Sequence, residues 1–137
     1  MNHFKRVVLY SSFLIIAFDT VGSFASEFFN FPYSSLNFGS YLIYGIAGFF
    51  ATKGKDLGKS ALAGFIVGLV EATIGWVISW LILTEHHELG ISPTVVIILI
   101  IIFVSLSGTY FGLIGGAIRK YVGKYFIEST TTDSSKE

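Results

Sequence analysis

The chain has 137 residues, of which 53% are hydrophobic and only 13% are charged, and its nine basic residues balance nine acidic ones. Soluble domains carry roughly 25% charged residues, so this composition excludes an ordinary soluble domain and a disordered chain. Without cysteine there is no disulfide framework and no cysteine-ligated metal or redox site, and a net charge of zero argues against nucleic-acid binding. The class that remains is an integral membrane protein that crosses the bilayer several times.

Four apolar segments have the length of a transmembrane helix, because about 20 residues cross a hydrocarbon core ~30 Å thick. They lie at about residues 7–25, 38–52, 60–83 and 93–118. The second is the shortest, and it reaches spanning length if it begins as early as Ser34. The sequence therefore predicts an all-α integral membrane protein, a compact bundle of four transmembrane helices within a single domain at residues 1–127.

The fourth segment contains an uninterrupted apolar run from Val95 to Val104 that is rich in β-branched residues. A strand of this length would leave backbone groups unpaired in lipid, whereas a helix satisfies its own, so we expect a helix. Ser92 and Pro93 fit its start as N-cap and first helical residue. After the fourth segment, residues 128–137 contain no apolar side chain, and we expect a disordered cytoplasmic tail there.

The lysine and arginine residues predict one orientation in the membrane. They are Lys5, Arg6, Lys53, Lys55, Lys59, Arg119, Lys120, Lys124 and Lys136. The other two connecting segments, 26–37 and 84–92, contain none. Because basic loops stay in the cytoplasm, both termini and the central loop are expected to be cytoplasmic. The compact loops and this charge distribution favour a plasma membrane of the bacterial inner-membrane type.

An alternative interpretation of the N-terminal segment is a secretory signal peptide. Residues 1–6 would be its basic region, residues 7–18 its apolar region, and Ser23–Ala25 its small-x-small cleavage site. Asp19 and the full spanning length of residues 7–25 argue against cleavage. If residues 1–25 are removed, three spans remain and keep their orientation.

Two carboxylates lie within the predicted spans, Asp19 in the first and Glu71 near the middle of the third, at similar depth. A charge there costs at least ~2.5 kcal/mol, and no span contains a lysine or arginine to neutralise it. Each acid must therefore be protonated, be hydrogen-bonded, share a proton with the other, or meet a partner. Hydroxyls available in the spans are those of Ser12, Tyr41, Tyr44, Ser105, Ser107, Thr109 and Tyr110. Glu71, Asp19, Ser105 and Ser107 form the candidate proton or cation site.

Glycines recur at helical spacing in the last three spans, which lets helix backbones approach closely in lipid. The predicted helix-packing residues are Gly45, Gly48, Gly64, Gly68, Gly75, Gly108, Gly112, Gly115 and Gly116. One stripe, in the third span, also carries Glu71, so this acid is expected to face other helices. The contacts can form within one chain or across a homodimer.

No pattern in the sequence predicts an enzyme, a metal site or a cofactor. Adjacent side chains in the run Glu85-His86-His87-Glu88 point apart on a helix, and no further ligand cluster accompanies them. Phosphate-binding, zinc-protease and nucleophile-elbow motifs are missing.

Two functions fit these patterns. The first is a non-enzymatic packing or assembly component of a membrane. The alternative is a small proton- or cation-coupled transporter that uses the mid-membrane carboxylate. The expected partners are the lipid bilayer and a second copy or another membrane protein, whose basic residue could pair with Glu71, and not a nucleic acid.

Overall fold

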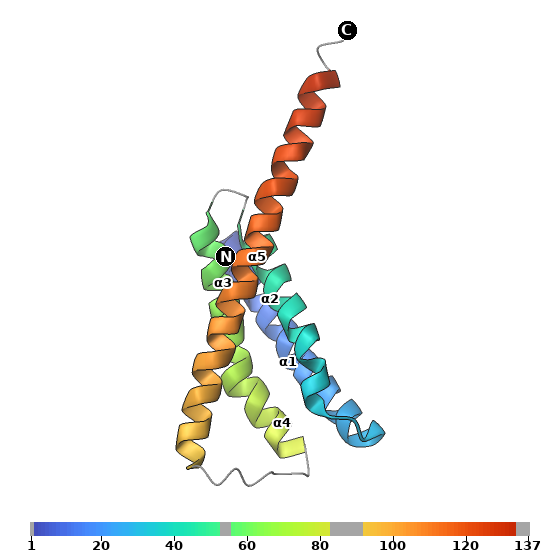
Figure 1. Cartoon of the computed structure of the whole chain (residues 1–137), viewed down its shortest axis with the longest axis vertical. Coiled ribbons are helices and arrows are strands. Elements are labelled where there is room, and N and C mark those ends of the chain that lie inside the picture. Colours follow the sequence, from blue (N-terminus) through green and yellow to red (C-terminus); the bar gives the residue numbers. More distant parts are fainter. Residues whose placement is uncertain (1, 53–55, 83–91, 134–137) are drawn as a thin grey trace.

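The computed structural model describes residues 2–52, 56–82 and 92–133, with side chains as far as Gly123. Every element in these ranges is a helix, so the prediction of an all-α fold is confirmed for them (Figure 1). The elements are α1 (His3–Phe29), the 3₁₀ turn η1 (Tyr33–Leu36), α2 (Asn37–Ala51), α3 (Leu57–Val70), the π-helical segment η2 (Glu71–Gly75), α4 (Trp76–Ile82) and α5 (Pro93–Asp133).

Within the described residues, three helical stretches are long and apolar enough to cross a membrane: His3–Phe29, Leu57–Ile82 and Thr94–Gly123. They correspond, within a residue at one end, to the first, third and fourth predicted spans. The second predicted span corresponds to α2, whose 15 residues extend only about 22 Å. Since η1 leads directly into α2 and adds about 8 Å, the continuous helical segment from Tyr33 to Ala51 is roughly 30 Å long.

Helix α5 starts as the sequence predicted and ends later. Its first residue is Pro93, and the Ser92 carbonyl accepts hydrogen bonds from the Val95 and Val96 amides at 3.0 and 3.2 Å. The helix then passes the expected end of the fourth span near residue 118 and continues to Asp133. It enters the segment 128–137 in which we expected disorder, and residues 134–137 lie outside the described ranges, so a disordered tail stays a prediction.

The helices run antiparallel between two ends of the bundle (Figure 1). The start of α1, the end of α2 and the start of α3 lie at one end, which we call the His3 end. The end of α1, η1, the end of α4 and the start of α5 lie at the other, which we call the Tyr33 end. Helix α5 projects beyond the His3 end, and the described lysines and arginines belong to segments at or beyond that end.

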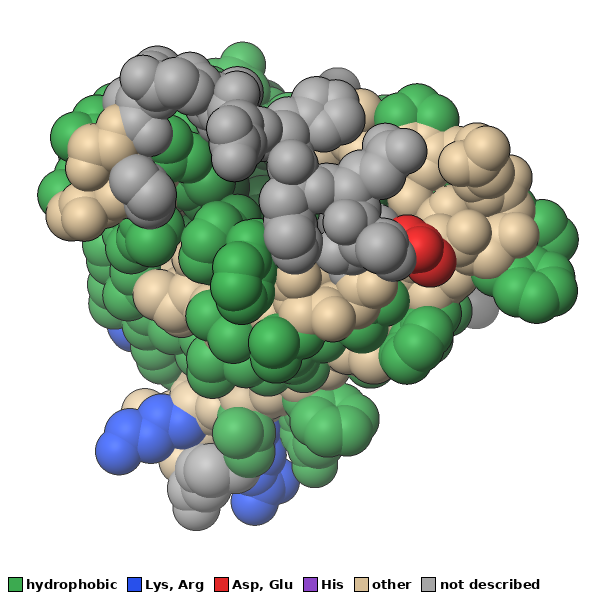
Figure 2. All heavy atoms as spheres, turned by 90° about the horizontal axis from the view of Figure 1, so that it is seen from below, with side chains coloured by type: hydrophobic (Ala, Val, Ile, Leu, Met, Phe, Trp, Pro, Cys, Tyr) green, Lys and Arg blue, Asp and Glu red, His purple; other side chains and the backbone are tan. Residues whose placement is uncertain are grey.

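The interior of the bundle is more polar than its outer surface. A small apolar cluster is buried around Ile15, Ala47 and Val67. Among the residues whose side chains are described, seven serines are buried too: Ser11, Ser23, Ser26, Ser40, Ser60, Ser79 and Ser105. Large apolar side chains such as Phe13 and Phe28 are exposed, by 74% and 83%. Hydrophobic side chains dominate the surface seen from the Tyr33 end (Figure 2). Lipid rather than water suits such an exterior, because lipid offers no driving force to bury it.

Candidate site: a buried pair of carboxyl groups

Asp19 of α1 is buried inside the bundle, with only 1% of its surface exposed. Its Oδ1 accepts a hydrogen bond of 2.8 Å from the hydroxyl of Tyr33, which reaches over from η1. Its Oδ2 is buried without a hydrogen-bond partner. An unpaired buried carboxylate oxygen is costly, so this oxygen is the place where a proton or a cation would gain most.

Glu71 is the first residue of η2 and is half-buried. The hydroxyl of Tyr44, on α2 and 1% exposed, donates a hydrogen bond to its Oε2. The buried hydroxyl of Ser40, one turn earlier on α2, also hydrogen-bonds this carboxyl. Helix α2 therefore supplies both hydroxyl donors to Glu71, while η1 supplies the donor to Asp19.

Gly75 provides the space in which the two carboxyl groups approach each other. A Cβ atom built on Gly75 would overlap Asp19 Oδ2 and would lie 3.1 Å from Asp19 Cγ and 3.4 Å from Glu71 Cγ. The unpaired oxygen of Asp19 thus lies over Gly75, on the face of the helix that carries Glu71. The structure brings the two sequence-predicted acids into one pair.

The pair lies at the only π-helical segment in the described chain, Glu71–Gly75. A π-helical turn closes i→i+5 hydrogen bonds and contains one extra residue, and such turns are frequent at functional sites. Within this segment the Thr73 hydroxyl donates hydrogen bonds to the carbonyl oxygens of Leu69 and Val70, at 2.7 and 3.3 Å, a contact that often bends helices. The apolar pattern of this helix does not predict a π-helical turn, and Thr73 and Gly75 are the residues that weakly favour one.

Neither acid has a described basic partner. Lys59 instead forms an ion pair with Asp56 at the His3 end. Arg119 donates a hydrogen bond to the carbonyl oxygen of Phe49 at 3.3 Å. The described hydrogen-bond donors to the carboxyls are hydroxyl groups, and each acid also lies near the other.

Ser105 and Ser107, the other two members of the predicted site, occupy different places. Ser105 is buried where α5 crosses α3, with its Cα 3.3 Å from a Cβ built on Gly68, and its hydroxyl has no hydrogen-bond partner. Ser107 is half-buried. The hydroxyls that bond the carboxyls in the described structure come from Tyr33, Ser40 and Tyr44 instead. Of these only Tyr44 was among the candidate hydroxyls; Tyr33 lies before the second predicted span, whereas Ser40 lies inside it.

The predicted packing glycines, Gly75 apart, line the crossings of α5 with α2 and α3. A Cβ on Gly112 would lie 2.6 Å from the Ser60 carbonyl oxygen and 3.0 Å from Gly64 Cα, and one on Gly68 would lie 2.8 Å from the Val104 carbonyl oxygen. The remaining close pairs are Gly48 with Gly112, Gly64 with Gly108, Gly115 with Gly45, and Gly116 with Ser60. The backbones of three helices therefore touch without intervening side chains.

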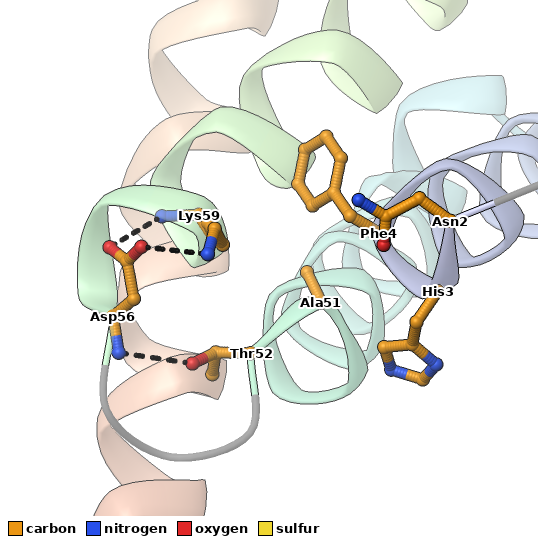
Figure 3. Close-up of a pocket in the computed structure, with 7 residues that line it drawn as sticks. All are labelled: Asn2, His3, Phe4, Ala51, Thr52, Asp56 and Lys59. Atoms are coloured by element: carbon orange, nitrogen blue, oxygen red, sulfur yellow. Dashed lines mark hydrogen bonds and ion pairs between the residues drawn. The ribbon is translucent and has the colours of Figure 1, made fainter.

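A shallow pocket of about 210 Å³ lies at the His3 end, between the starts of α1 and α3 and the end of α2 (Figure 3). The hydrogen bonds made by the residues lining this pocket satisfy backbone groups at helix ends. His3 Nε2 donates to the Phe50 carbonyl at 2.9 Å, and Asp56 Oδ1 accepts from the Lys59 amide at 3.3 Å. These are capping interactions. No group of metal-ligating side chains occurs in the described part of the chain, and the run Glu85–Glu88 lies outside it.

No protein-family model matches the chain, and the searches of curated proteins and of solved structures found no match. The geometry of the carboxyl pair is therefore the basis for assigning a function.

Proposed function

We propose that the protein is a four-span protein of a plasma membrane, with both termini in the cytoplasm. The length of η1 plus α2, roughly 30 Å, supports a second span in addition to the three apolar ones. The gathering of basic residues at the His3 end supports that end as the cytoplasmic one.

Within this membrane setting, the proposed role is a small transporter coupled to the binding of a proton or a monovalent cation at Asp19 and Glu71. The observation that carries this role is the burial of Asp19 against Glu71, with Oδ2 unpaired and no described basic residue beside it. Two carboxylates this close in a medium of low dielectric constant cannot both remain charged. A bound proton or cation neutralises the pair, and its exchange with water is the step that transport requires.

Assembly of a membrane complex is the second candidate function. It is favoured by the large exposed apolar side chains on α1 and α5, which a partner helix could cover. A basic residue of such a partner could neutralise Glu71, which is only half-buried. In that case the pair would be a permanent structural contact rather than an exchanging site.

Chemical labelling at different pH values separates the two functions. Native membranes are treated with a hydrophobic carbodiimide, which modifies protonated carboxyls reached from lipid, and labelled residues are identified by mass spectrometry. The transporter role predicts that labelling of Glu71 or Asp19 falls as the pH rises through the physiological range. Absence of labelling at every pH would support the assembly role. The same spectra show whether residues 1–25, and with them Asp19, are retained.

Substitution of the acids adds a functional test. Glu71→Gln and Asp19→Asn keep size and hydrogen-bonding capacity but cannot exchange a proton. They should abolish proton uptake by reconstituted vesicles while leaving the purified protein monodisperse. The matched control is Asp56→Asn, which removes an exposed carboxyl at the His3 end and should leave uptake unchanged.

A further inference from the structure

The two oxygens of the Asp19 carboxyl have different surroundings. Oδ1 accepts the hydrogen bond from the Tyr33 hydroxyl, whereas Oδ2 is buried and has no hydrogen-bond partner. Since Asp19 is only 1% exposed, bulk water does not supply the missing contact. This is the pattern expected of a protonated carboxyl group, in which the carbonyl oxygen accepts a hydrogen bond and the other oxygen carries the O–H group.

The Glu71 carboxyl has the surroundings of a charged group instead. The Tyr44 hydroxyl donates to its Oε2, and the Ser40 hydroxyl hydrogen-bonds the same carboxyl. Both hydroxyls are buried on α2, so water does not compete for them. Hydrogen bonds donated to a carboxylate favour its charged form. Two fixed donors therefore favour a charged Glu71, whereas Asp19 has one donor.

Gly75 allows the two carboxyls to complete each other's hydrogen bonds. A Cβ atom built on Gly75 would overlap Asp19 Oδ2 and would lie 3.4 Å from Glu71 Cγ, so Oδ2 is on the side of Asp19 that faces Glu71. A proton on Oδ2 is therefore directed toward a carboxylate that can accept it. With this proton in place, Oδ2 is no longer an unsatisfied buried atom, and the pair carries one negative charge instead of two.

We infer that Asp19 Oδ2 carries the one exchangeable proton of the pair, and that Glu71 keeps its charge and positions this proton. The inference rests on the proposed transport function and names its ion, one proton per chain in each cycle. On release the O–H bond of Asp19 breaks, its electron pair stays on Oδ2, and the proton passes to water. Tyr33 contacts Asp19 directly and is half-buried, so the acid lies one side chain away from the molecular surface.

A proton suits this site better than a metal ion does. It needs one oxygen to bond and a second to accept a hydrogen bond, and Asp19 and Glu71 provide these. Hard metal cations instead gather several oxygen ligands. Within the described residues no third acidic or histidine side chain joins the two carboxyls. The nearby hydroxyls of Tyr33 and Tyr44 already direct their hydrogens at the carboxyls.

The other titratable side chains that face the pair are tyrosines. Tyr33 of η1 and Tyr44 of α2 donate to the acids, and Tyr41 lies beside Tyr44 with ring centroids 6.3 Å apart. Helix α4 contributes no titratable side chain, and Glu27 of α1 is exposed two turns beyond the pair. The described basic side chains belong to segments at or beyond the His3 end. A protonated carboxyl inside the described bundle therefore belongs to the pair.

Isotope-edited infrared spectroscopy tests the assignment on the full-length protein in lipid vesicles, at neutral pH and in a buffer free of alkali metal ions. The carbonyl stretch of a protonated carboxyl is separate from the bands of a carboxylate, and a heavy carbon isotope in that carboxyl lowers its frequency. We expect the band to shift in protein made with carboxyl-labelled aspartate and to stay in place with labelled glutamate. Asp56 is exposed and paired with Lys59, so it should be ionised and silent.

Substitutions then link the band to one residue. Asp19→Asn should remove the band, because Glu71 keeps its charge. Glu71→Gln should retain it, still on aspartate. Asp56→Asn is the matched control for removal of a carboxyl, and it should leave the band unchanged.

Removing the donors of Glu71 should move the proton. In the double variant Ser40→Ala and Tyr44→Phe the charge on Glu71 loses both hydroxyls, so part of the band should now shift with labelled glutamate. Tyr110→Phe removes a hydroxyl from an exposed ring of α5 and should leave the whole band on aspartate. A double variant whose band stays wholly on aspartate would contradict the role given to the two hydroxyls.

The outcomes separate the assignment of the proton from the function itself. A wild-type band that shifts with labelled glutamate, or a band that is lost in Glu71→Gln, overturns the inference and leaves proton binding by the pair in place. A wild-type protein without any band of a protonated carboxyl overturns the proposed function and the inference together, because no ion would then neutralise the two acids.

Discussion

The bundle has two kinds of helix contact, and they differ in almost every physical respect. Where α5 crosses α2 and α3, glycines bring backbones together, and a Cβ on Gly112 would lie within 3.0 Å of the facing helix. We call this region the glycine seam (Gly48, Gly64, Gly108, Gly112 and Gly115). Where α1 meets η2 and α4, the contact includes acids and hydroxyls. We call that region the polar seam (Asp19, Ser23, Glu71, Gly75 and Ser79).

The contrast shows how the chain can combine a fixed scaffold with a responsive site. Close backbone packing depends on shape alone and is indifferent to pH. The polar seam instead contains an unpaired buried oxygen at Asp19 and a π-helical turn at Glu71, which are features that cost stability. We therefore expect α2, α3 and α5 to stay together while α1 and η2 respond to protonation.

The largest expected effect comes from filling the glycine seam. Gly112→Leu should separate α5 from α3, because even a Cβ would be 2.6 Å from the Ser60 carbonyl oxygen. We expect a loss of more than about 3 kcal/mol of folding free energy and aggregation in detergent, seen by size-exclusion chromatography. Gly123→Leu on the same helix is the control, since a Cβ there meets nothing within 4 Å. Equal behaviour of the two variants would refute the scaffold role of the seam.

Filling the polar seam should have a smaller effect on stability and a larger one on the acid pair. In Gly75→Ala the new methyl group would occupy the position of Asp19 Oδ2, so the carboxyl must move away from Glu71. We expect a cost of about 2 kcal/mol and a changed pH profile of carbodiimide labelling. Gly45→Ala, whose Cβ would be 3.8 Å from the Phe111 carbonyl oxygen, should leave the profile as it is. A wild-type profile in Gly75→Ala would mean that the two acids do not interact.

The glycine seam was more accessible to sequence reasoning than the polar seam. Glycines such as Gly64 and Gly112 repeat at helical spacing, and the period of the repeat shows which face they share. Counting along the predicted spans places Asp19 and Glu71 at similar depth. The hydroxyl partners of the two acids could not be predicted in this way. Tyr33 lies in the turn after α1, and the path of a turn depends on packing that no local sequence pattern encodes.

Two other features could not be predicted from the sequence for a related reason. The π-helical turn at Glu71 is a choice between two hydrogen-bond registers in the same apolar helix, and small differences in packing decide it. Ser105 was assigned to the site by its depth alone. Depth along a helix does not give the direction of a side chain, and α5 turns this serine toward Gly68.

Removing one hydroxyl tests how firmly the polar seam holds Glu71. Tyr44→Phe leaves Oε2 without its donor from α2, and since Tyr44 is 1% exposed, water cannot easily replace it. We expect a loss of about 1 kcal/mol and labelling of Glu71 that persists to higher pH, because the charged form loses a hydrogen bond. Tyr110→Phe, on an exposed ring of α5, should change neither quantity. Unchanged labelling in Tyr44→Phe would show that Ser40 alone satisfies the carboxyl.

The smallest effect is expected outside both seams, at the exposed N-terminus of α3. Hydrogen bonds from Lys59 lower the pKa of Asp56 below its ordinary value, and the Lys59 ammonium lies 3.2 Å from its carboxylate. A carboxyl with a lowered pKa in the folded state stabilises the protein above the pKa of the unfolded chain, about 4, and this contribution disappears as the pH falls through the folded-state value. Asp56→Asn keeps an N-cap side chain but removes the charge. Its stability, followed by the fluorescence of Trp76 and Trp80, should be slightly below wild type at pH 6, and the difference should shrink as the pH falls below about 4. A difference that grew toward low pH would have the wrong sign for a stabilising capping carboxylate and would contradict this role of Asp56.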